Sequence, residues 1–75
     1  MLTQYQLWEA YQKGQLDTVK QELDRYGTVT GDNKWDEPEG HYKGANRATT
    51  YSYQGHKWSV EMLNGEVRAL GREKA

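Results

Sequence analysis

A chain of 75 residues has room for one small domain. Its large aliphatic residues are few, with six leucines, four valines and neither isoleucine nor phenylalanine, but three tryptophans and six tyrosines supply large rings. The formal net charge is only −1, so the chain lacks the strong self-repulsion of typical disordered sequences. We therefore expect one folded domain with an aromatic core.

Several classes of protein are excluded by composition. The absence of cysteine excludes a disulfide scaffold, thiolate catalysis and Cys-type zinc sites. No apolar run approaches the roughly 20 residues of a membrane span, and the first residues lack a signal-peptide pattern. We expect a cytoplasmic protein that needs no membrane and no cofactor.

Residues 3–13 and 16–26 are predicted to form two short helices. Thr3 and Gln6 have the spacing of a capping box, and Gly14 suits a helix C-terminus. An apolar stripe marks the second helix: Leu16, Val19, Leu23 and Tyr26. A single long helix bent at Gly14 is the alternative.

Residues 12–27 resemble the helix pair of an ankyrin repeat, at Gly14, Leu16, Val19, Lys20, Leu23 and Gly27. The resemblance covers under a quarter of the chain, and the Thr-Pro-Leu-His turn that opens such repeats is absent. We interpret it as a shared helix-hairpin pattern rather than kinship.

Residues 28–30 read as a short strand, and residues 31–46 as a long acidic loop. Residues 31–40 hold the only proline and four acids against one lysine. Trp35 lies within this loop, where we expect it either to pack onto the domain or to meet a partner. Lys34 and Glu37 break the EF-hand pattern, so no metal site is expected.

An antiparallel meander is predicted for residues 47–54, 57–63 and 66–72. Asn64–Gly65 is the sequence of a type I′ hairpin turn, and Gln54–Gly55 indicates the preceding turn, with a loop of two or four residues. In an uninterrupted ladder the pairs across the two hairpins are Tyr51–Trp58, Thr49–Val60, Met62–Val67, Glu61–Arg68, Val60–Ala69, Ser59–Leu70, Trp58–Gly71 and Lys57–Arg72.

This pairing predicts which side chains face the helices. Tyr51, Trp58 and Val60 point inward and need cover, which the two amphipathic helices supply. Lys57, Arg68 and Arg72 point outward together with Leu63 and Leu70, and Arg47 lies near the edge of that outer face. The expected fold is therefore α+β, with two N-terminal helices packed on a three- or four-stranded antiparallel sheet.

The outer face is the predicted contact surface. Two leucines among its charges exceed what a solvated face needs, and the chain is rich in tyrosine, tryptophan and arginine, which often carry interface energy. We expect a small non-catalytic interaction protein, acting as a regulator or inhibitor, that binds another protein or a second copy of itself. The predicted contact residues are Trp35, Tyr42, Arg47, Lys57, Leu63, Arg68, Leu70 and Arg72.

Two other functions stay open. Residues 41–75 carry six cations against three acids, so the basic C-terminal sheet is a candidate for weak nucleic-acid binding through Arg47, Lys57, Arg68 and Arg72. Only His41 and His56 could act as bases near neutral pH, which leaves a small enzyme as a third function. No Gly-x-Ser-x-Gly motif accompanies them.

Overall fold

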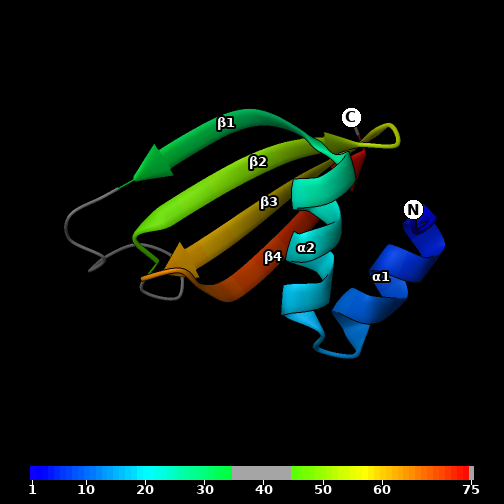
Figure 1. The fold of residues 1–75 in the computed structure, drawn as a ribbon, viewed down its shortest axis with the longest axis horizontal. Helices are drawn as coiled ribbons and strands as arrows, with labels where there is room; N and C mark the ends of the chain where they lie inside the picture. The colour runs from blue at the N-terminus through cyan, green and yellow to red at the C-terminus, as the bar shows by residue number, and fades with distance from the viewer. Residues whose placement is uncertain (35–44, 75) are drawn as a thin grey trace.

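The computed structural model describes residues 1–34 and 45–74, and Figure 1 shows a helix pair beside a four-stranded sheet. The predicted α+β fold is confirmed. Strand order across the sheet is β1-β2-β3-β4, and all neighbours are antiparallel. The elements are α1 (Gln4–Gln12), α2 (Leu16–Tyr26), β1 (Thr28–Lys34), β2 (Arg47–Tyr53), β3 (His56–Leu63) and β4 (Glu66–Lys74).

The two helices are separate, as the glycine between them predicts. Thr3 and Gln6 form the capping box, because each side chain accepts the backbone N–H of the other residue. Gly14 has a φ of +77°, which favours glycine, and it follows the end of α1. The N–H groups of Gly14 and Gln15 donate to Tyr11 and Ala10, a Schellman pattern that ends the helix.

Both hairpin turns contain two residues with positive φ. The values are 49° and 78° at Gln54–Gly55, and 51° and 84° at Asn64–Gly65. Such a backbone matches the right-handed twist of the flanking strands. The predicted β2–β3 register is confirmed, because Tyr51 pairs with Trp58 and Thr49 with Val60.

A bulge in β4 changes the second register after two pairs. Leu63–Glu66 and Met62–Val67 pair as predicted, but Glu61 then pairs with Ala69, which leaves Arg68 as the extra residue. An uninterrupted ladder was therefore the wrong prediction beyond this point. The residue at the bulge is an arginine, so no turn-forming residue marked it in the sequence.

The bulge moves the rest of β4 by one position. Leu70 now pairs with Val60 and Arg72 with Trp58, and both partners are fully buried residues on the helix-covered face. Leu70 itself is buried. Ala69 and Gly71 take the outward positions instead, so the outward placement of Leu70 and Arg72 was wrong.

β1 is longer than the sequence predicted. Residues 31–34 continue the strand, with Gly31 opposite Thr50 and Lys34 opposite Arg47, so a loop beginning at residue 31 was wrong. The strand is almost wholly exposed and lacks apolar alternation, which explains the missing signal. Glycine fits at 31 because an added Cβ would lie 2.7 Å from Thr50 Oγ1. Within the predicted loop, residues 35–44, which include Trp35, His41 and Tyr42, lie outside the described residues.

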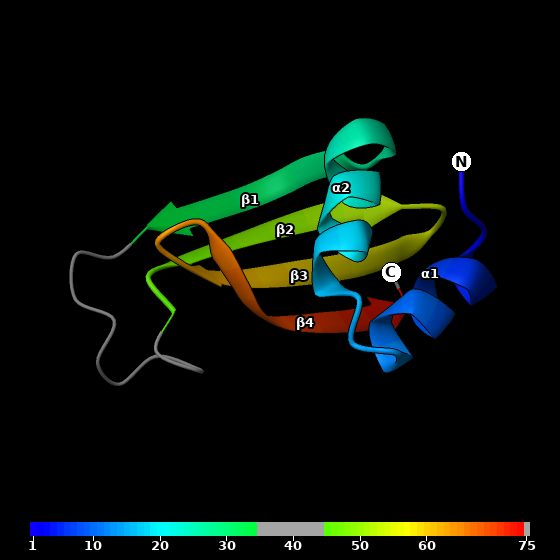
Figure 2. The same cartoon turned by 60° about the horizontal axis from the view of Figure 1, so that its bottom comes forward.

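The core lies between the helix pair and the sheet, and Figures 1 and 2 show both helices on one face of it. Its largest fully buried side chains are Trp58, Tyr53, Leu7, Leu23, Val19 and Val60. Gln4 ties α1 to the sheet, because its amide donates to the carbonyl oxygen of Tyr53 and accepts from Trp58 Nε1. The expected aromatic core is present.

Candidate functional site

The outer face is the side of the sheet that neither helix covers. Small side chains fill its centre, where Thr50, Ser59 and Gly71 lie in one row across β2, β3 and β4. Ala48 and Ala69 flank Glu61 in the next row. Because these side chains are short, a shallow hollow of about 310 Å³ opens there, lined by Thr50, Lys57, Ser59, Gly71 and Arg72.

The structure separates the predicted contact residues. Lys57 and Leu63 lie at outward positions of β3, and Leu63 is half-buried. Arg68 is exposed at the bulge, with Nη1 3.4 Å from Glu66 Oε1. Leu70 belongs to the core, and Arg47 and Arg72 lie on the helix-covered side.

Arg72 packs against the aromatic core instead of pointing away from it. Its guanidinium carbon lies 4.4 Å from the ring centre of Trp8 and 5.9 Å from that of Trp58. Trp8 in turn lies 4.9 Å from the ring of Tyr11. Arg72 therefore joins β4 to α1 through cation–π contacts. Sequence reasoning missed this role because it depends on the bulge.

The four cations that were predicted to bind nucleic acid do not share one face of the sheet. Arg47 and Arg72 lie on the helix side, whereas Lys57 is at an outward position. The continuous basic surface that supported nucleic-acid binding is therefore absent from the part of the chain described.

Of the two histidines considered as catalytic bases, His56 lies in the part of the chain that the structure describes. His56 lies at the start of β3, and its Nδ1 is 3.2 Å from the carbonyl oxygen of Gln54. Within residues 1–34 and 45–74, no three His, Cys, Asp or Glu residues are placed to hold a metal ion.

A second concave site lies on the helix side, between α2 and the sheet, and we call it the α2–sheet groove. Its volume is about 270 Å³. α2 forms one wall, β1 and β2 form the floor, and the β3–β4 turn contributes Gly65. The lining residues are Lys20, Asp24, Val29, Asp32, Arg47, Thr49, Tyr51, Met62 and Gly65.

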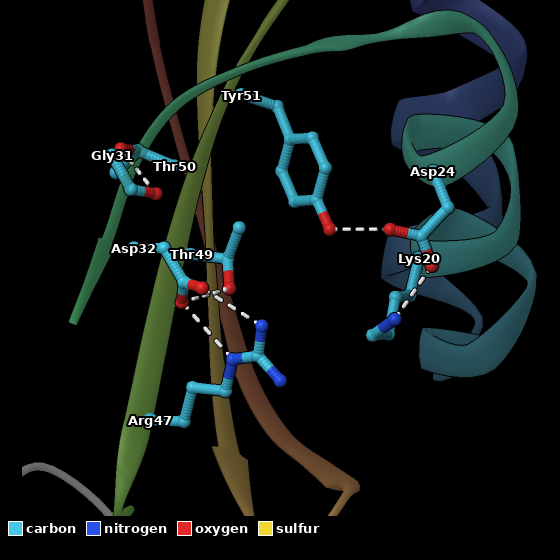
Figure 3. A network of polar contacts seen from close by, with 8 residues as sticks. All are labelled: Lys20, Asp24, Gly31, Asp32, Arg47, Thr49, Thr50 and Tyr51. Atoms are coloured by element: carbon cyan, nitrogen blue, oxygen red, sulfur yellow. Dashed lines mark hydrogen bonds and ion pairs between the residues drawn. The ribbon is translucent and has the colours of Figure 1, made fainter. Parts of the chain in front are cut away.

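Asp32 and Arg47 form the sheet side of the groove (Figure 3). Arg47 donates from Nε and Nη2 to the two carboxylate oxygens of Asp32, at 3.0 and 2.8 Å. Thr49 Oγ1 donates to the same carboxylate at 3.1 Å. The Arg47 hydrogen bonds lower the pKa of Asp32, and Asp32 in turn raises the pKa of Arg47.

Asp24 forms the helix side. It accepts the Tyr51 hydroxyl at 2.5 Å and pairs with Lys20 Nζ, also at 2.5 Å. Burial acts to raise the pKa of Asp24, but the hydrogen bonds from Lys20 and Tyr51, with the charges of Lys20 and Arg47, outweigh it and lower the pKa. Burial and the bond to Asp24 raise the pKa of Tyr51.

Part of this groove could be predicted from the sequence. Alternation placed Thr49 and Tyr51 on the helix-facing side of β2, which the structure confirms. The acidic partners were not predicted, because Asp24 was one of several helix acids and Asp32 was assigned to a loop. Their pairing depends on the exact packing of α2 and on the register of β1.

Comparison with known proteins identifies a family but no function. In the described part of the chain, no helix is long and apolar enough to cross a membrane. No curated protein and no solved structure matches the sequence. Residues 1–73 match the family described as "Domain of unknown function (DUF7449)", so the chain belongs to that family.

Proposed function

We propose that this chain is a small non-catalytic interaction protein that binds a protein partner through the outer sheet face. The observation that carries the proposal is the hollow at Thr50, Ser59 and Gly71. Long side chains normally shield the free face of a small sheet, whereas here short ones leave a depression of about 310 Å³. A side chain of a partner can fill such a depression and bury its surface against the strands.

Residues around the hollow supply further contacts. Lys57 lines it and offers a charge to an acidic or hydrogen-bonding group of the partner. Leu63, half-buried at the end of β3, adds apolar surface on the same face. In this proposal Trp35 and Tyr42 extend the contact surface, and the protein acts in the cytoplasm as a regulator or inhibitor of its partner.

The direct test fills the hollow without disturbing the core. Gly71 does not have a positive φ, and an added Cβ would meet Ser59 Oγ at 3.5 Å, an ordinary contact. Gly71→Arg should therefore fold and place a long side chain over the hollow. Gln12→Arg adds the same side chain at an exposed position of α1 and serves as the matched control.

Immobilised wild-type and variant proteins would be incubated with extract from the native source, and bound proteins identified by mass spectrometry. A partner of the outer face is retained by wild type and by Gln12→Arg, and is reduced at least tenfold by Gly71→Arg. Equal retention by all three proteins, with unchanged circular dichroism spectra, would show that the outer face is not the contact surface. A sedimentation measurement of wild type tests whether that partner is a second copy.

A further inference from the structure

We infer that the α2–sheet groove is a binding site for a single oxyanion, a carboxylate or a phosphate, held between the Arg47 guanidinium and the Lys20 ammonium. The groove lies on the opposite side of the sheet from the hollow at Gly71. The inference is therefore independent of the proposed function, and either can fail alone.

Both cations have hydrogen-bond donors left for a ligand. A guanidinium has five N–H groups, and Asp32 uses one on Nε and one on Nη2. Figure 3 shows the other terminal nitrogen of Arg47 pointing away from Asp32, toward α2. An ammonium has three N–H groups, and Asp24 accepts one from Lys20. The two sets of remaining donors come from opposite walls of one groove.

The charge around the groove favours an anion. Lys20 and Arg47 line the groove, and Lys34, which pairs with Arg47 across the β1–β2 ladder, is a third cation beside it. They stand against the two carboxylates of Asp24 and Asp32. Each carboxylate already accepts at least two hydrogen bonds, so its repulsion of an incoming anion is reduced. The charges of Arg47 and Asp24 also influence each other across the groove.

The size of the groove limits the ligand to a small group. Its volume of about 270 Å³ lies below the roughly 300–1,000 Å³ that is usual for sites that enclose a whole drug-sized molecule. A phosphate, or a carboxylate at the end of a short side chain, fits this space. The planar guanidinium suits either group, because its two terminal nitrogens can donate to two oxygens at once.

The test is a pair of NMR titrations of ¹⁵N-labelled full-length protein, one with inorganic phosphate and one with acetate. Sodium chloride keeps the ionic strength constant, because diffuse charge effects would otherwise imitate binding. We expect saturable shifts at the Arg47 Nε–H and at the amides of Thr49 and Tyr51. Lys20→Gln should weaken binding at least fivefold, and Lys20→Arg should restore it.

Lys13→Gln is the matched control, because it removes an exposed cation just after α1 that does not line the groove. It should leave the titration unchanged. Tighter binding of phosphate than of acetate indicates a phosphate ligand, and tighter binding of acetate indicates a carboxylate. Shifts that do not saturate, or binding that Lys20→Gln leaves unchanged in a folded protein, would overturn the inference. Arg47→Lys provides a second variant, which should also weaken binding.

Discussion

The two faces of the sheet are built from side chains of very different size. On the helix-covered face, Trp58, Tyr53 and Val60 are almost completely buried and make the sheet half of the core. On the outer face, Ser59 and Gly71 fill the row next to Trp58, and both have little or no side chain. The contrast shows that one face makes the core of the domain, and it supports the proposal that the other face binds a partner. Which residues belong to which face depends on one bulge in β4.

The largest change in stability is expected from substitutions at two leucines on the same hairpin, one on each face of the sheet. Leu70→Asp places a carboxylate in the core, so we expect a loss of about 3–5 kcal/mol in the free energy of unfolding, enough to unfold a domain of this size. Leu63→Asp changes a half-buried outer position and should cost about 1 kcal/mol or less. Urea unfolding followed by circular dichroism measures both, and equal losses would contradict the assignment of faces.

A smaller effect is expected when the bulge itself is removed. Deletion of Arg68 leaves Met62 opposite Val67 and Glu61 opposite Ala69, so Leu70 and Arg72 stay on the helix-covered face. The cost should be about 1–2 kcal/mol, from the lost bend of the strand. Insertion of one alanine between Ala69 and Leu70 is the control, because it turns both inward residues outward. An insertion that is tolerated better than the deletion would refute the observed register.

Substitution of Arg72 tests the contact between the sheet and α1. Arg72→Ala removes the guanidinium that lies over Trp8, and we expect a loss of about 1 kcal/mol with a change in tryptophan fluorescence. Arg68→Ala removes an exposed arginine four residues earlier in β4 and should change neither quantity measurably. Identical behaviour of the two variants in urea and in fluorescence would show that Arg72 does not stack on the rings.

The sequence was sufficient for the elements whose signals are local. The capping box at Thr3, the glycine after α1 and the two hairpin turns each depend on a few neighbouring residues, and all are present. The β4 bulge is different, since it is selected by burial of Leu70 between helix and sheet rather than by any residue at the bulge. The same holds for Arg47 with Asp32, which are brought together by β1 pairing that a polar sequence does not predict. Of the eight candidate contact residues, Arg47, Leu70 and Arg72 were therefore placed on the wrong face, and Trp35 and Tyr42 lie outside the described residues.

The smallest effect concerns the pH dependence of the helix-covered face, where two tyrosine hydroxyls meet carboxylates of α2. Tyr51 bonds to Asp24, and the Tyr53 hydroxyl lies 2.6 Å from Glu22 Oε2. The net effect of these surroundings is a lowered pKa for both carboxyl groups, even though burial acts to raise it. Burial and the neighbouring carboxylates raise the pKa of both tyrosines.

The signs of these shifts predict a plateau of stability with two limits. A carboxyl group whose pKa is lowered by folding stabilises the protein above its unfolded value, here 4.5 for Glu22 and 3.8 for Asp24, and the contribution is lost as the pH falls further. A tyrosine whose pKa is raised by folding stabilises the protein below its ordinary value of 10.0, and the contribution is lost as the pH rises above it. Stability should therefore be nearly constant with respect to these groups between about pH 5 and 9.

Tyr51→Phe measures the contribution of the Tyr51–Asp24 hydrogen bond separately from that of Tyr53 and Glu22. It should cost about 1 kcal/mol at pH 7, because one hydrogen bond to a partly exposed carboxylate is lost. The difference from wild type should shrink below about pH 4, where the unfolded Asp24 carboxyl binds a proton more readily than the folded one, and above about pH 10, where the unfolded tyrosine ionises more readily than the folded one. Tyr5→Phe, at a side chain that is 74% exposed, should leave the urea unfolding curve unchanged across the whole range. A Tyr51→Phe difference that is constant from pH 3 to pH 11 would mean that the hydroxyl stabilises the protein by filling space rather than by its bond to Asp24.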